Sequence, residues 1–152
     1  MRTYKGKRAT ARLITTMAGL ATMAISLVGA ASEQLVDTVW DYDHGFGCVT
    51  TITFLDTEKY LLESSGQVVM KEYELTQHRD TEFFLLAQET VANNNQPSCA
   101  GIKAGRVGSR QRAYVQFGTE DGTLTFFPKP DNESPVRVTY LRRNFAPVEP
   151  QE

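Results

Sequence analysis

The sequence predicts an all-β fold, in particular an antiparallel up-and-down β-barrel of about eight strands. Apolar and polar residues alternate through most of the stretch 36–142, and a period of two is typical of strands. Short turn signals separate the alternating runs, and no run has apolar residues at the 3.6-residue spacing of a long helix. Sequential strands of this number tend to close, because closure removes exposed sheet edges. A two-sheet β-sandwich is the alternative.

The strands are predicted where the alternation is clearest. In the first run, Trp40 and Tyr42 share one face with Val36 and Thr38. Two pairs of adjacent rings, Phe83-Phe84 and Phe126-Phe127, place one ring on each face, so we expect one ring of each pair to be exposed as a protein contact surface. The predicted strands occupy 36–43, 46–54, 57–63, 68–75, 81–88, 113–117, 124–127 and 136–142.

The net charge of -2 combines two unlike parts of the chain. Residues 1–30 carry five basic and no acidic side chains, whereas the remaining 11 basic and 18 acidic side chains give -7. A basic segment, an apolar run over 13–28 and small residues at 29–31 follow the order of a secretory signal peptide. The apolar run is too short, and too often interrupted by polar residues and glycine, to be a retained membrane helix. We therefore expect a signal peptide over 1–30 and a secreted or periplasmic protein with no stable membrane span after cleavage.

The remaining chain is expected to form one β-barrel domain over 31–143, followed by a disordered C-terminal tail over 144–152. Export favours a disulfide between Cys48 and Cys99, the two cysteines of the chain. A domain of net charge -7 is a poor partner for nucleic acid, since phosphate binding needs a basic face. No cofactor is predicted, and two cysteines without paired histidines are a poor zinc site.

The segment 90–110 interrupts the strand pattern, and a loop of this length in a compact domain is often functional. Cys99 lies within it, so a disulfide would hold the loop against the sheet as a cover over one mouth, or simply as a structural staple. A cluster of basic residues without an intervening acid occupies this loop and the strand after it. We expect it to bind an anionic ligand or an acidic protein surface; its members are Lys103, Arg106, Arg110 and Arg112.

Candidate catalytic and metal-binding residues are few. Asp41 and Asp43 point the same way on a strand, and the simplest interpretation is a solvated outer face, because no third or fourth metal ligand is near in sequence. His44 and His78 are the only histidines, and the chain holds no Gly-x-Ser-x-Gly nucleophile motif. We therefore predict no catalytic residues and no metal site.

The layout resembles the calycin superfamily, the lipocalins and their relatives. The resemblance lies in a Trp on the first strand, Trp40, an eight-strand meander, and a basic end to the last strand. In lipocalin-like barrels that Trp packs across the closed end under an Arg of the last strand, which the resemblance assigns to Arg142. The lipocalin signature has Gly two residues before the Trp, whereas this chain has Thr38.

A second, weaker resemblance is to periplasmic inhibitors of bacterial metalloproteases, which are also small exported barrels. They share a Trp near the mature N-terminus and a Cys soon after it, as in Trp40 and Cys48, but their second Cys lies much closer than Cys99 does. In these inhibitors the residues before the first strand enter the cleft of the target. The corresponding residues here are 32–35.

These observations favour an exported, non-catalytic, lipocalin-like binding protein that holds a small apolar or anionic ligand. One alternative is a protein-binding inhibitor or immunity factor against an exported hydrolase, and another is a small secreted enzyme. An apolar cavity above about 300 Å³ would favour a ligand. A filled interior with exposed aromatic rings would favour a protein partner. An enzyme would need His44 or His78 in a cleft beside a carboxylate and a nucleophile.

Overall fold

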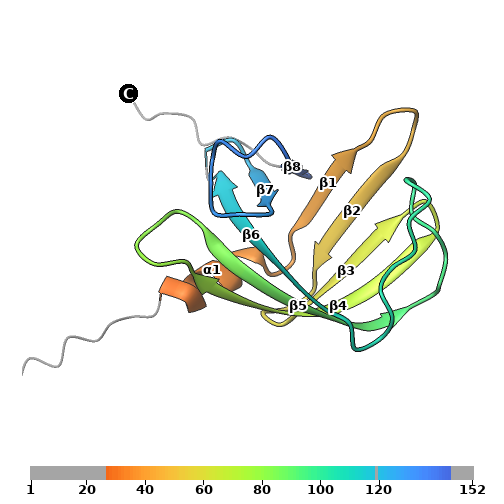
Figure 1. Cartoon of the computed structure of the whole chain (residues 1–152), viewed down its shortest axis with the longest axis horizontal. Helices are drawn as coiled ribbons and strands as arrows, with labels where there is room; N and C mark the ends of the chain where they lie inside the picture. The colour runs from red at the N-terminus through yellow and green to blue at the C-terminus, as the bar shows by residue number, and fades with distance from the viewer. Residues whose placement is uncertain (1–26, 119, 145–152) are drawn as a thin grey trace, which may run out of the picture.

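The computed structural model describes residues 27–118 and 120–144. Most of the predicted signal peptide and of the predicted C-terminal tail lies outside the described residues. The eight strands form a closed antiparallel barrel in chain order, which confirms the predicted fold class (Figure 1). The elements are α1 (Leu27–Leu35), β1 (Val39–Asp43), β2 (Val49–Phe54), β3 (Lys59–Ser64), β4 (Gln67–Gln77), β5 (Phe84–Asn93), β6 (Arg110–Gly118), β7 (Thr123–Phe127) and β8 (Val138–Arg142).

Closure occurs between the first and last strands, where Trp40 lies opposite Arg142 and Asp41 lies opposite Leu141. On the outer surface of this seam, Arg143 donates from Nε and Nη2 to the two carboxylate oxygens of Asp41, each at 2.7 Å. This hydrogen bonding lowers the pKa of the Asp41 carboxyl group below its usual value. Asp41 is thus part of an ion pair across the seam.

One end of the barrel, which we call the helix end, is covered by α1 and holds the predicted Trp–Arg pair. Leu35 is buried in the core beside Trp40. The Trp40 indole Nε1 donates to Thr38 Oγ1 at 2.8 Å, and Thr38 in turn donates to the Leu35 carbonyl oxygen at 2.5 Å. Trp40 and Arg142 line the same small cavity of about 220 Å³ under the helix. The position that is Gly in the lipocalin signature is therefore occupied by a hydroxyl that holds the indole.

The middle of the barrel is filled by large side chains, which come from every second residue of the strands. The rings of Phe54, Tyr60 and Tyr73 lie 5.3–5.8 Å apart in tilted and edge-on arrangements, which are the favourable geometries for aromatic pairs. Leu86 and Val115 close the opposite wall, each about 1–2% exposed. The interior is therefore filled at this level.

The segment between β5 and β6 is shorter than predicted. Strand β5 continues through Thr90 and Val91 to Asn93, so the connecting loop covers 94–109 rather than 90–110. Thr90 N donates to the Ser109 carbonyl and Gly108 N to the Thr90 carbonyl, which ties the base of the loop to itself. The extension reflects the β-branched pair Thr90-Val91, whose strand propensity exceeds the loop tendency of the asparagines that follow.

Two predictions about phenylalanines are wrong. Phe83 and Phe127 lie outside the barrel wall but are only 6% and 3% exposed, because their rings pack edge to face at 5.2 Å. Phe46 was expected in the second strand, facing inward. It lies instead in the tight turn before β2, with φ 57° and a fully exposed side chain. The flanking Gly45 and Gly47 allow this turn, since both adopt positive φ.

Candidate functional site

The other end of the barrel, the disulfide end, consists of the β1–β2 turn (44–48), the β3–β4 turn (65–66), the loop 94–109 and the β7–β8 loop (128–137). The predicted disulfide is present, with Cys48 and Cys99 Cα atoms 5.6 Å apart. The buried Gln67 side chain adds a second tether, because its Nε2 donates to the carbonyls of Gln96 and Ile102, both at 3.0 Å. The disulfide and Gln67 together hold the loop across the barrel mouth (Figure 1).

A cavity of about 290 Å³ lies beneath this loop. Its walls come from β2, β3, β4 and β6, and its cover comes from the segment 98–105. Among the residues that the structure describes, none of those lining this cavity is acidic. The lining residues are His44, Thr50, Leu62, Ser64, Gln67, Val69, Lys71, Ser98, Ala100, Ile102, Lys103, Ala104, Gly105 and Gln111.

Lys71 is the cationic side chain that β4 directs inward. It lies opposite the buried Tyr60 on β3, and it is on the same face of β4 as the buried Val69 and Tyr73. Lys71 Nζ donates to Gln111 Oε1 at 2.8 Å, and it forms no ion pair with any residue in the described part of the chain. Burial lowers the pKa of the Lys71 ammonium group, because a desolvated cation is less stable than the neutral amine.

A network of neutral groups fixes the acceptor of Lys71. The Tyr60 hydroxyl donates to Gln88 Oε1, and Gln88 Nε2 donates to Gln111 Oε1 at 3.2 Å. Gln111 Oε1 therefore accepts from both Gln88 and Lys71. Burial raises the pKa of the Tyr60 phenol, so this group stays a donor at neutral pH. The network holds the Lys71 ammonium group in place without neutralising its charge.

A second chain of hydrogen bonds follows the opposite wall. His44 Nε2 lies 2.8 Å from Thr50 Oγ1, and Thr50 Oγ1 lies 2.8 Å from Ser64 Oγ. Ser64 Oγ also accepts from Cys99 N at 3.2 Å, which links the chain to the disulfide. Thr50 and Ser64 are 6% and 1% exposed. The cavity thus combines a half-buried cation, Lys71, with several neutral polar groups.

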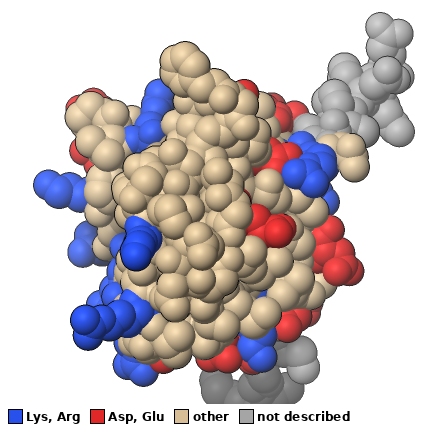
Figure 2. Space-filling model, turned by 90° about the vertical axis from the view of Figure 1, so that its right-hand side faces the viewer, with Lys and Arg blue, Asp and Glu red and all other residues tan. Residues whose placement is uncertain are grey.

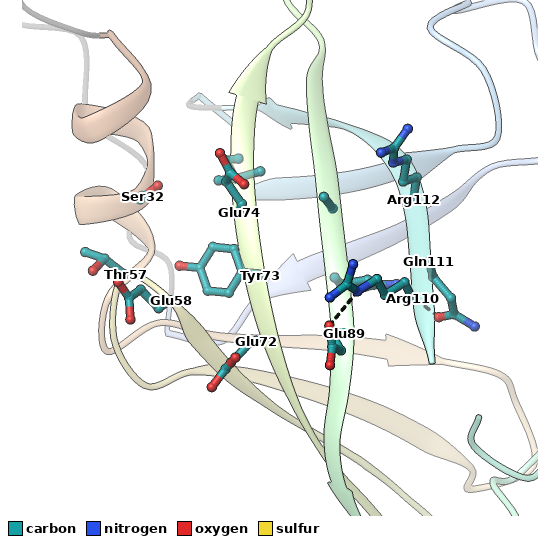
Figure 3. Close-up of a pocket in the computed structure, with 13 residues that line it drawn as sticks. Ser32, Thr57, Glu58, Glu72, Tyr73, Glu74, Glu89, Arg110, Gln111 and Arg112 are labelled. Atoms are coloured by element: carbon teal, nitrogen blue, oxygen red, sulfur yellow. Dashed lines mark hydrogen bonds and ion pairs between the residues drawn. The ribbon is translucent and has the colours of Figure 1, made fainter. Parts of the chain in front are cut away.

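The structure separates the four predicted ligand-binding residues. Lys103 lines the mouth cavity, and Arg106 is exposed in the covering loop. Arg110 and Arg112 lie on β6, on the outer surface of the barrel, where they border a different hollow (Figure 3). The four residues therefore do not form one site.

That outer hollow is an open groove of about 900 Å³ over β4, β5 and β6. Figure 3 shows Glu89 of β5 meeting Arg110 of β6, while Glu72 and Glu74 of β4 lie farther from the two arginines. Arg110 Nε donates to Glu89 Oε2 at 2.7 Å, while Arg112 forms no ion pair with any described residue. The groove offers charges of both signs to solvent, and Tyr73, Leu75 and Ala87 contribute apolar lining between them. Its acidic residues are Glu58, Glu72, Glu74 and Glu89.

The two histidines lie in different places. His44 borders the mouth cavity with its ring 4.5 Å from that of Tyr42, and His78 lies in the β4–β5 turn with its ring 5.1 Å from that of Tyr114. In the described part of the chain, no three His, Cys, Asp or Glu side chains are grouped so that they could hold a metal ion. His44 has a hydroxyl partner in Thr50, but no acidic residue lines its cavity.

The sequence analysis did not identify Lys71, Gln111, Thr50 or Ser64 as site residues. A usable signal was present for Lys71, because it is in phase with Val69, Tyr73 and Leu75, all of which are buried. A lysine on the apolar face of a strand is unusual enough to mark a candidate site. The neutral residues carried no such signal.

Comparisons with known proteins give no assignment: no protein family, no curated protein and no solved structure matches this chain. The closed eight-stranded barrel is consistent with a calycin-like fold, and membership of that superfamily stays a prediction. Within the described residues, the structure contains no helix of the length and apolar character that a membrane span needs.

Proposed function

We propose that this protein is an exported, calycin-like binding protein without catalytic activity, and that it holds a small anionic ligand in the mouth cavity. The observation that carries the proposal is Lys71, an inward-facing cation in a cavity without an acidic lining residue among those described. The predicted signal peptide and the disulfide support export.

The charge of Lys71 supports an anionic ligand. A partly desolvated ammonium group is stabilised by an opposite charge. Lys71 Nζ donates to one protein acceptor, Gln111 Oε1. A carboxylate or phosphate oxygen would accept from its other N–H groups and supply the opposite charge. Lys103 on the covering loop adds a second cation to the same cavity.

The size of the cavity supports a small ligand. Its volume of about 290 Å³ is just below the lower limit of about 300 Å³ for ligand pockets, which leaves room only for a compact ligand. The aromatic residues Phe54, Tyr60 and Tyr73 fill the barrel below it, so a long apolar ligand has no room to enter further. The ligand we expect is therefore compact and anionic, with only a short apolar part.

The two alternative functions receive less support. In the metalloprotease inhibitors that this chain resembles, a segment before the first strand enters the target. Here the corresponding residues belong to α1, and Leu35 is buried in the protein's own core. For an enzyme, His44 would need a carboxylate as well as the hydroxyl of Thr50, and none lines its cavity among the described residues.

The proposal is tested with Lys71→Met, and Lys129→Met serves as a matched control because Lys129 is exposed in the β7–β8 loop. Binding of inorganic phosphate and of acetate is measured by isothermal titration calorimetry at constant ionic strength. We expect saturable 1:1 binding of at least one anion to the wild type and to Lys129→Met. Binding to Lys71→Met should weaken by about tenfold or more, which corresponds to about 1.4 kcal/mol.

Equal affinity of Lys71→Met and the wild type would refute the proposed site. So would the absence of saturable binding for both anions in the wild type. Lys71→Met is expected to fold, because Met has a similar length and suits a buried position.

A further inference from the structure

The disulfide end also carries most of the large apolar side chains that the barrel exposes. Six of the eight such residues in the described part of the chain lie there: Val136 in the β7–β8 loop, and five more in the β1–β2 turn, at the starts of β2 and β4, and in the loop 94–109. Three of these five are strongly exposed: Phe46 at 109%, Ile102 at 67% and Val107 at 63%. The other two are Val49 and Val68. We call these five residues the apolar rim.

The apolar rim is held by fixed structure. Phe46 is two residues from Cys48, and Ile102 is three residues from Cys99, so the disulfide ties their two loops together. The Ile102 carbonyl accepts from Gln67, and Val68 is fixed by hydrogen bonds with Asn94 in both directions, at 3.0 and 3.1 Å. Exposed apolar side chains on such a restrained scaffold are typical of a surface that binds something.

The charges around the apolar rim are segregated. Figure 2 looks onto this end and shows a largely uncharged centre, with most Lys and Arg on the left and most Asp and Glu on the right. Two rim residues have a basic neighbour in sequence, in Ile102-Lys103 and Arg106-Val107, and the loop 94–109 contains no acid. Acidic residues of this end are on the β1–β3 side. Glu63 on β3 lies opposite Thr51 on β2, and its carboxylate is one of the charges that raise the pKa of the Arg143 guanidinium group.

We propose that the protein docks with the loop side of the apolar rim on a lipid bilayer that contains anionic phospholipids. Phe46, Ile102 and Val107 would enter the headgroup region, and Lys103 and Arg106 would pair with anionic headgroups. This proposal does not depend on a ligand in the mouth cavity.

The form of the apolar rim favours a bilayer over a protein partner. Its members come from a turn, two strand starts and one loop, so the apolar side chains are contributed by separate segments of the chain. A protein interface has a contiguous apolar core with matched shape, whereas a bilayer interface adapts to separate side chains. Anionic headgroups also attract basic residues placed beside the inserted side chains. With the acids on the far side, the protein would bind tilted towards the loop 94–109.

Co-sedimentation with vesicles tests the proposal directly. Vesicles of phosphatidylcholine alone are compared with vesicles of phosphatidylcholine and phosphatidylglycerol. We expect the wild type to bind the anionic vesicles and to bind the neutral ones at least tenfold more weakly. Binding should weaken as salt rises, because the electrostatic part is screened.

Two pairs of matched variants identify the surface. Phe46→Ser with Ile102→Ser should lower vesicle binding about tenfold or more, whereas Leu55→Ser with Leu141→Ser should leave it unchanged, since both leucines are exposed outside the disulfide end. Lys103→Glu with Arg106→Glu should lower it by a similar factor, because each basic residue near a membrane contributes about fivefold. Arg79→Glu with Lys59→Glu has the same change in charge at the helix end, away from the apolar rim, and should have a smaller effect.

Three outcomes would overturn the proposal. The wild type could fail to bind either kind of vesicle, which would leave the apolar rim as a surface that binds a protein. The control pairs could lose as much binding as the rim variants, which would show an effect of net charge alone. Binding to vesicles could also vanish in Lys71→Met, which would mean that the mouth cavity takes a lipid headgroup and the rim does not bind the bilayer. Normal vesicle binding by a Lys71→Met variant that has lost phosphate or acetate binding separates the two proposals.

Discussion

The two ends of the barrel are closed by different physical means. At the helix end, α1 buries Leu35 against Trp40, and hydrogen bonds through Thr38 fix the indole. At the disulfide end, a covalent bond and the Gln67 side chain hold a loop over a cavity lined by apolar and polar residues. The first closure stabilises the fold by burying apolar surface, and the second leaves a half-buried cation, Lys71, without a counterion among the described residues. The two ends are thus stabilised in different ways, and the proposed binding site belongs to the disulfide end.

The largest loss of stability is expected at the helix end. Trp40→Ala removes a buried indole and leaves the Thr38 hydroxyl without its donor. Core truncations of this kind cost about 3–5 kcal/mol, and we expect a value near the upper limit. Urea unfolding followed by circular dichroism measures it. A loss of about 1 kcal/mol or less would show that the indole does not anchor this end. Anion binding by the surviving folded protein should be unchanged.

The next largest effect is expected from the disulfide. The bond joins residues separated by 51 positions, for which the chain-entropy relation gives about 4 kcal/mol. The variant Cys48→Ser with Cys99→Ser should therefore unfold at a much lower urea concentration. Limited proteolysis should also cut first within 94–109, because this loop would lose its main tether. Unchanged protection of the loop would indicate that Gln67 alone holds it.

The smallest effect is expected at the exposed ion pair of Asp41 and Arg143. Asp41→Asn should cost no more than about 1 kcal/mol, since surface pairs contribute about 0–1 kcal/mol. Because folding lowers the pKa of Asp41, the contribution is present above the unfolded value of about 3.9 and is lost as pH falls through the folded value. Unfolding of the wild type and of Asp41→Asn between pH 7 and pH 2 should therefore converge at the acid limit. A difference that persists at pH 2 would point to another cause.

Alternating polarity was enough to predict the barrel. Trp40, Val115 and Leu124 lie in the strands predicted for them, and their side chains are buried in the barrel core. The expectation of export, together with the presence of two cysteines, predicted the Cys48–Cys99 bond. Phe46 was misplaced because its apolar character fitted the alternation, whereas its two glycine neighbours set a turn. At this position the positive φ angles that the glycines allow decide the local structure, and the hydrophobic pattern does not.

The candidate site was harder to predict, because proximity in sequence is not proximity in space. The basic cluster looked continuous, but strand β6 begins at Arg110 and places Arg110 and Arg112 on its outer face. Only Lys103 of the four reaches the mouth cavity. Lys71 lies in a strand, β4, whose sequence showed no motif. Its proposed role depends on its partial burial and on a cavity lining without a carboxylate among the described residues. Neither can be deduced from the sequence of one strand.

We propose that the half-buried ammonium group of Lys71 binds an anion, and the titration of Lys71 tests this most directly. Nuclear magnetic resonance of the lysine side chains, with Lys71→Met to assign the signal, reports the pKa with and without inorganic phosphate. The account predicts a Lys71 pKa below its ordinary value in the free protein, and a rise when phosphate binds, because an anion stabilises the charged form. The exposed Lys129 should not respond. An ordinary Lys71 pKa that phosphate and acetate leave unchanged would contradict the account.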